Sequence, residues 1–302
     1  MKIWLNKNIA NIISGYITFA WIGVLGVVVS PMYIKAFGVN QWGLIAACIS
    51  MQIFSNFIDV GFSQLVPKWI SEYSDKENEL KELVAIFFRI YSILGFLLFL
   101  FIQVFAEYLS HSWFKVQISD AARLEFAIRI VGIQMTFQFM NNLYISVWNG
   151  VRKQVAANIK STFFATIKHL MAIGYIYYAE VKMFEVYVEI FSLVAVIEYL
   201  YNSFFFWRKY RIGKKNERLS DKIKLTSILR EISVMSVGIF LGLMVSQYDK
   251  IILSKTVDVH LYGVYTTMLL LATAFLQLQI PVTRAYLPVL AKGIDEQKIF
   301  NE

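Results

Sequence analysis

Eight apolar blocks, each about 17–23 residues long, constrain the fold of this 302-residue chain more than any other feature. A helix of about 20 apolar residues spans the hydrocarbon core of a bilayer. The chain is 58% hydrophobic and 17% charged, which is more apolar than the core of a soluble domain requires. We therefore predict an all-α, polytopic transmembrane helical bundle. The predicted spans are Ile9–Val29, Leu44–Val66, Leu83–Phe105, Phe126–Val147, Ala156–Tyr178, Phe184–Phe206, Ile232–Leu253 and Val264–Ile280.

The chain contains four prolines, and none lies in the middle of a block. Because proline breaks the hydrogen bonding of a helix interior, this placement predicts long uninterrupted helices. Six of the seven tryptophans fall at or just outside the block ends, in the headgroup region that indole prefers. They are Trp4, Trp42, Trp69, Trp113, Trp148 and Trp207.

Lysine and arginine predict the orientation. They are concentrated in the N-terminal segment and in the loops after spans two, four and six, and they are sparse in the other loops. Since basic loops stay on the cytoplasmic side, the N-terminus is expected in the cytoplasm. The most basic segment runs from Arg208 to Lys224.

We predict three parts: residues 1–207 as a six-helix membrane lobe, 208–228 as a basic cytoplasmic linker, and 229–302 as the first two helices of a second lobe. The linker is interpreted either as a topological anchor or as a contact with anionic lipid headgroups. These loops account for the net charge of +8, so nucleic acid is not an expected partner.

A weak internal repeat supports the two-lobe prediction. The segments 35–44 and 255–264 share a lysine and an aromatic-glycine pair, and a proline follows each at a nearly constant offset, at Pro67 and Pro288. Six spans separate the copies, so both run the same way through the membrane. This pattern is typical of a parallel repeat of six-helix halves, with substrate held between them.

Three stretches, YIKAFGVNQWGL, IDVGFSQLVPKWIS and GVYTTM…LATAFLQLQIPVTRAYLPVLAK, resemble the Wzx-type flippases of the multidrug/oligosaccharidyl-lipid/polysaccharide exporter superfamily. The resemblance implies about twelve helices, of which this chain would hold eight. It also implies that the protein flips polyprenyl-diphosphate-linked oligosaccharide, such as O-antigen repeat units, across the bacterial inner membrane. The alternatives are a cation-coupled multidrug exporter of the same superfamily and, with less support, a membrane-embedded polysaccharide polymerase.

Polar residues recur at helical spacing in spans two, four, five and eight, so each of these helices has one polar face. Such faces either hydrogen-bond to neighbouring helices or line a hydrated cavity. The polar positions of span four include Gln138, Asn141 and Asn142.

Five charged residues fall inside spans: Lys168, Arg129, Asp59, Glu198 and Asp249. Each costs about 2.5–3.5 kcal/mol at the bilayer centre unless it meets water or a partner. One hypothesis is mutual pairing. The other is that Lys168 and Arg129 hold the anionic headgroup of the lipid-linked oligosaccharide, while carboxylates bind a coupling proton or Na⁺. Lys168, Arg129, Asp59, Glu198, Asp249, Asn142 and Gln138 are the predicted translocation residues.

No catalytic motif is present. Cys48 is the single cysteine, the three histidines are far apart in the predicted topology, and there is no Walker A loop or H-E-x-x-H motif. We therefore expect neither an enzyme nor a cofactor or metal site, and membrane lipids as the other contacts of the chain.

The orientation can be tested with a reporter that is active only outside the cytoplasm. We expect activity when the reporter is fused near Trp113 and silence when it is fused near Lys214. The reverse pattern, activity near Lys214 and silence near Trp113, contradicts the predicted topology.

Overall fold

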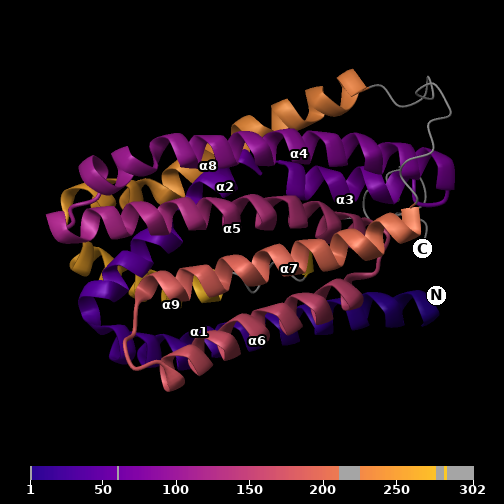
Figure 1. Ribbon diagram of the computed structural model, residues 1–302. Helices are drawn as coiled ribbons and strands as arrows, with labels where there is room; N and C mark the ends of the chain where they lie inside the picture. Colours follow the sequence, from indigo (N-terminus) through magenta and orange to yellow (C-terminus); the bar gives the residue numbers. More distant parts are fainter. Residues whose placement is uncertain (1, 60, 211–224, 277–281, 284–302) are drawn as a thin grey trace.

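The protein is a bundle of long α-helices (Figure 1). The computed structural model describes residues 2–59, 61–210, 225–276 and 282–283, and within these the predicted all-α class is confirmed, with no β-strand. The helices in chain order are α1 (Lys2–Ser50), α2 (Gln52–Ile58), α3 (Phe62–Glu72), α4 (Glu77–Tyr108), the π-helical turn η1 (Leu109–Trp113), α5 (Ile118–Gly150), α6 (Gln154–Tyr178), α7 (Phe184–Tyr210), α8 (Leu225–Thr256) and α9 (Val259–Leu276).

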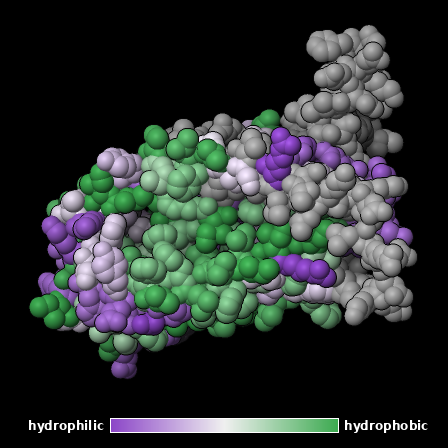
Figure 2. Space-filling model, turned by 90° about the horizontal axis from the view of Figure 1, so that it is seen from above, coloured by the Kyte–Doolittle hydropathy of each residue, from purple (hydrophilic) through white to green (hydrophobic). Residues whose placement is uncertain are grey.

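Four helical segments in the described part are long and apolar enough to cross a membrane: Ile9–Ile58, Glu77–Trp113, Phe184–Lys209 and Ser236–Thr256. Large apolar side chains are exposed along them, including Phe96, Val104 and Val245 at 60%, 73% and 81% exposure. Figure 2 shows hydrophobic residues over the middle of one face and hydrophilic residues towards its end. A surface of this kind is suited to lipid and not to water.

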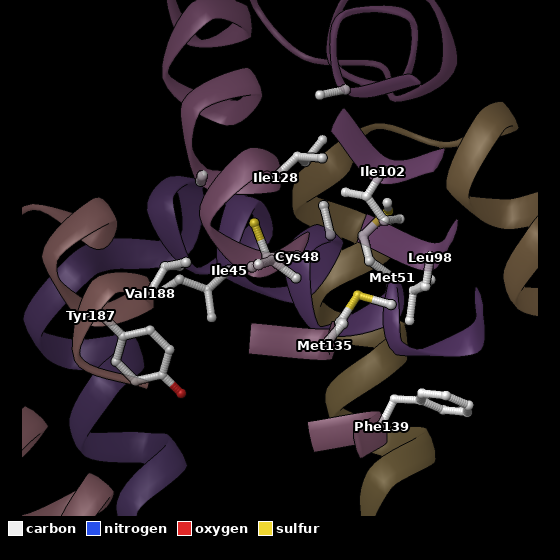
Figure 3. Close-up of a cluster of buried hydrophobic side chains, with 14 of the residues drawn as sticks. Ile45, Cys48, Met51, Leu98, Ile102, Ile128, Met135, Phe139, Tyr187 and Val188 are labelled. Carbon is white, nitrogen blue, oxygen red and sulfur yellow. The ribbon is translucent and has the colours of Figure 1, made fainter. Parts of the chain in front are cut away.

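The core forms around α5, which packs against α3, α4, α6 and α7. The second part of α1 enters this core after a kink at Gly38, whose φ of 75° lies in the left-handed region that favours glycine. Beyond the kink, every residue from 42 to 48 is buried. Figure 3 shows Ile45 and Cys48 of this segment close to side chains of α4, α5 and α7.

The prediction of uninterrupted helices is wrong for span two, Leu44–Val66. Its helix turns at Met51 and breaks between Asp59 and Gly61, where Gly61 has a left-handed φ of 83°. Proline is not the cause, because Pro31 lies inside α1 and Pro67 inside α3. Glycine carries no Cβ, so it adopts this conformation without the steric cost that other residues meet.

The two copies of the sequence repeat are in contact with each other. A Cβ added to Gly43 would lie 2.6 Å from the carbonyl oxygen of Val259, and one added to Gly263 would lie 3.0 Å from the Cα of Gly43. Trp42 is buried here and donates from Nε1 to Thr267 Oγ1 at 3.0 Å, so it does not face the headgroups. Glycine thus allows α1 and α9 to pack backbone to backbone.

Several predicted features lie outside the described residues: most of the linker 208–228, the end of the last span, and Pro288. The division into two lobes stays a prediction. Lys68 of α3 and Glu231 of α8 form an ion pair at 3.1 Å, which joins α8 to the first helices.

Replacing Gly43 with alanine should lower the apparent unfolding temperature in detergent by several degrees. Its Cβ would collide with backbone, which cannot rotate away, and overpacking of this kind costs about 1–3 kcal/mol. Gly23→Ala, on the same helix but with nothing within 4 Å, is the matched control and should be neutral or slightly stabilising. Equal melting of both variants would show that α1 and α9 do not pack this closely.

Candidate functional site: a polar network between α5, α6 and α7

A chain of hydrogen bonds connects α6, α7 and α5 inside the bundle. Lys160 Nζ donates to Asn202 Oδ1 at 3.2 Å, and Asn202 Nδ2 donates to Asn141 Oδ1 at 2.8 Å. Asn141 Nδ2 then donates to Glu198 Oε1 at 3.1 Å. Glu198 in turn interacts electrostatically with Lys168. We call these five residues the Glu198 cluster.

Helix periodicity brings the members of the Glu198 cluster together. Glu198 and Asn202 are four residues apart on α7, and Lys160 and Lys168 are eight apart on α6, so each pair shares one helix face. Between them lies a cavity of about 10 Å³, lined by Lys160, Ser161, Glu198 and Asn202 with neighbouring apolar residues. That volume is about the size needed for one water molecule.

Both lysines lie near aromatic rings, Lys160 near three of them and Lys168 near one. Lys160 Nζ lies 4.3 Å from the ring centroid of Trp148, and it is also near Tyr201 and Phe205, at 5.2 and 5.4 Å. Lys168 Nζ lies 5.2 Å from the ring centroid of Phe191. A cation over an aromatic face gains about 0.5–2 kcal/mol, more when it is desolvated. Aromatic rings therefore contribute to the environment of both cations on α6, beside the carboxylate of Glu198.

A second cluster forms at the break in span two. Asp59 is the last residue before the break; its Oδ1 accepts from the Tyr91 hydroxyl and its Oδ2 from Asn142 Nδ2, both at 3.4 Å. Gln52 Nε2 donates to Gln138 Oε1 at 3.2 Å, also between α2 and α5. We call Asp59, Tyr91 and Asn142 the Asp59 cluster.

The two clusters lie on different sides of α5. Asn141 belongs to the Glu198 cluster and Asn142 to the Asp59 cluster. Successive residues of an α-helix project about 100° apart, so two adjacent asparagines serve two different helix interfaces.

Three predicted translocation residues lie in neither cluster: Gln138, whose partner is Gln52, and also Arg129 and Asp249. Arg129 donates to Glu125 Oε1 of its own helix at 2.6 Å and to the Gln103 carbonyl of α4 at 2.9 Å. Asp249 of α8 accepts a hydrogen bond from the Tyr265 hydroxyl of α9. Arg129 is thus ion-paired with Glu125, which is not among the five charges predicted inside the spans, and the partner of Asp249 is a neutral hydroxyl. These contacts do not show the mutual pairing raised as a hypothesis by the sequence.

Sequence reasoning missed several members of the network. The sequence does not predict a role for Lys160 or Asn202, although the spacing of four residues between Glu198 and Asn202 is a usable signal. Near Lys168, the Tyr33 hydroxyl hydrogen-bonds with His169 Nδ1 at 2.9 Å. No pattern in the sequence relates Tyr33 to His169, because the residues lie 136 positions apart on different helices.

Among the described residues, no three His, Cys, Asp or Glu side chains converge as a metal site requires. The Glu198 cluster instead offers groups that could bind a ligand: two partly buried cations, one carboxylate and two amides that can each donate and accept.

Asn141→Ala should destabilise the protein by about 0.6–1.7 kcal/mol, the range for hydrogen bonds between membrane helices. The variant leaves Glu198 and Asn202 without their shared partner, so in a double-mutant cycle it should couple to Asn202→Ala. Unfolding in mixed micelles measures both effects. Asn56→Ala, at an exposed position of α2, is the control and should be near neutral. Strict additivity of the Asn141 and Asn202 changes would contradict the network.

No protein-family model and no curated protein matches this chain. One solved structure, described as "protein A", is similar with a TM-score of 0.72 at 12% sequence identity. The match covers 97% of this chain and 66% of that one, so the chain spans about two thirds of the neighbour's length. At this identity the likeness shows the fold alone: the bundle has the arrangement of a known helical structure.

Proposed function

We propose that the protein is a membrane transporter that flips polyprenyl-diphosphate-linked oligosaccharide across the bacterial inner membrane, with its N-terminus in the cytoplasm. The observation that carries the proposal is the Glu198 cluster, in which two lysines of an apolar bundle lie on one face of α6. Lys160 is joined through Asn202 and Asn141 to Glu198, and Lys168 interacts electrostatically with the same carboxylate. Its members come from three helices, each of which is expected to span the membrane.

The chemistry of the substrate requires such groups. A diphosphate carries negative charge, and moving it through a medium of low dielectric constant needs positive charge along the path. Lys160 lies one and a half turns from the start of α6 and Lys168 near its middle. The two cations therefore stand at different depths, as a stepwise path for an anionic headgroup would need.

Glu198 fits the role of a counter-charge that the substrate replaces. A lysine at mid-membrane depth is costly without a partner, and Glu198 supplies one when no substrate is bound. An arriving phosphate would compete with this carboxylate for Lys168, so the lysine would have a counter-charge before and after the exchange, and Glu198 would keep its hydrogen bond from Asn141.

The Asp59 cluster favours a role in coupling transport to a proton or Na⁺. A cation-coupled drug exporter would need a site of the same kind. A carboxylate at a helix break, with a hydroxyl and an amide donating to it, can take up a proton or Na⁺ while the break changes shape. Export of a drug-like cation would use Asp59 and Glu198 and would not need the lysines of α6. The two functions therefore differ in their dependence on Lys168.

Lys168→Ala should abolish translocation while leaving insertion and expression unchanged. Lys168→Arg should keep part of the activity, because charge matters more here than donor geometry. Restoration of surface polysaccharide in a strain that lacks its own flippase measures the activity, and immunoblotting of membranes measures the amount of protein.

Lys182→Ala, in the connection between α6 and α7, is the control and should transport normally. If Lys168→Ala lowers the amount of folded protein and the remainder transports normally, Lys168 is a structural ion-pair partner and the proposed path is wrong.

A further inference from the structure

A cavity of about 410 Å³ lies where α5 and α7 end. Its walls come from Val147, Trp148 and Val151 of α5 and from Phe205 and Phe206 of α7, and Arg208 and Lys209 complete it. This volume falls within the range of ligand-binding cavities, about 300–1,000 Å³. Among the residues that the structure describes, two basic side chains and no acidic one line it.

The inner part of the cavity is apolar, and its outer edge carries positive charge. Phe206 is buried, whereas Arg208 and Lys209 are exposed at the helix end. Lys209 Nζ lies 5.8 Å from the ring centroid of Trp148. The indole therefore lies between the apolar wall of the cavity and its basic edge. This gradient matches a molecule with an apolar tail and a charged head.

A third cation, Lys153, comes from the turn after α5. Lys153 is close enough to Lys209 for the two side chains to interact electrostatically. Two ammonium groups held this close repel each other, and an anion between them would relieve the repulsion.

The turn between α5 and α6 fixes Lys153 in this place. Arg152 adopts a left-handed φ of 56°, which is uncommon for a residue with a side chain. The Lys153 amide then donates back to the Trp148 carbonyl at 2.8 Å, which closes the helix end. The backbone thus holds Lys153 over the same end of α5 that supplies Trp148.

We propose that this cavity binds one anionic glycerophospholipid of the adjacent leaflet, with its phosphate held by Arg208, Lys209 and Lys153 and the start of its acyl chains against Trp148, Val151 and Phe205. The helix ends lie at headgroup depth, where tryptophan is also preferred. Charge complementarity selects an anionic lipid, and the aromatic wall selects an amphiphile over free phosphate. The site borders the Glu198 cluster, because Trp148 and Phe205 also lie against Lys160, but none of the five residues of that cluster lines the cavity, and binding there requires no transport.

The test uses the full chain, purified in an uncharged detergent, and native mass spectrometry to count bound lipid. Phosphatidylglycerol should bind at least tenfold more tightly than phosphatidylcholine, with one molecule per chain. The double variant Arg208→Gln/Lys209→Gln should weaken phosphatidylglycerol binding about 30-fold, since each cation near an anionic headgroup contributes slightly more than about fivefold. The control double variant Lys35→Gln/Lys182→Gln, at the other end of the bundle, should bind as the wild type does.

Three outcomes overturn the proposal. Equal binding of the two lipids would make the cavity an unselective apolar groove. Equal loss in the control variant would make the effect one of overall charge. Displacement of phosphatidylglycerol by equimolar polyprenyl phosphate would assign the cavity to the transported lipid. If the Arg208/Lys209 variant does not fold, a salt titration of the wild type decides, because the phosphatidylglycerol preference should fall as salt rises.

Discussion

Backbone N–H and C=O groups inside a bilayer must find partners within the protein, and this constraint governs the break in the second hydrophobic segment. The Asp59 amide still donates to the Ser55 carbonyl, and the Phe62 amide donates to the carbonyl of Asp59, so the helix is interrupted without leaving these groups bare. The break also turns the Asp59 side chain towards Tyr91 and Asn142. The same break therefore orients the Asp59 carboxylate and keeps these backbone groups hydrogen-bonded.

The segment before the break is equally constrained by packing. Residues 42–48 are buried on all sides, because α5 and α7 cover one side and the start of α9 covers another. Lipid is as apolar as leucine, so helices in a membrane associate through close van der Waals contact more than through the hydrophobic effect. Gly43 and Gly263 allow this close contact between α1 and α9, which attaches α9 to the first helix.

The Glu198 cluster shows how the bundle holds charge without placing lysine and glutamate side by side. An amide both donates and accepts, so Asn202 accepts from Lys160 and donates to Asn141, which donates to Glu198. All these donors point towards the carboxylate. Positive charge at α6 and negative charge at α7 are thus connected through neutral groups, and the aromatic rings around Lys160 supply the rest of its environment.

The sequence by itself determined the helices and the membrane character, because apolar length and the cost of a buried charge are properties of each segment alone. It also placed Lys168 and Glu198 inside helices, and Asp59 inside a span that the structure shows to be broken at that residue. Only the tertiary structure decided that Lys168 is opposite Glu198 while Arg129 pairs with Glu125, that Trp42 faces inwards, and that a glycine breaks span two. Periodicity shows which residues share a face of one helix, but the rotation of each helix and the neighbour it meets depend on packing among all of them.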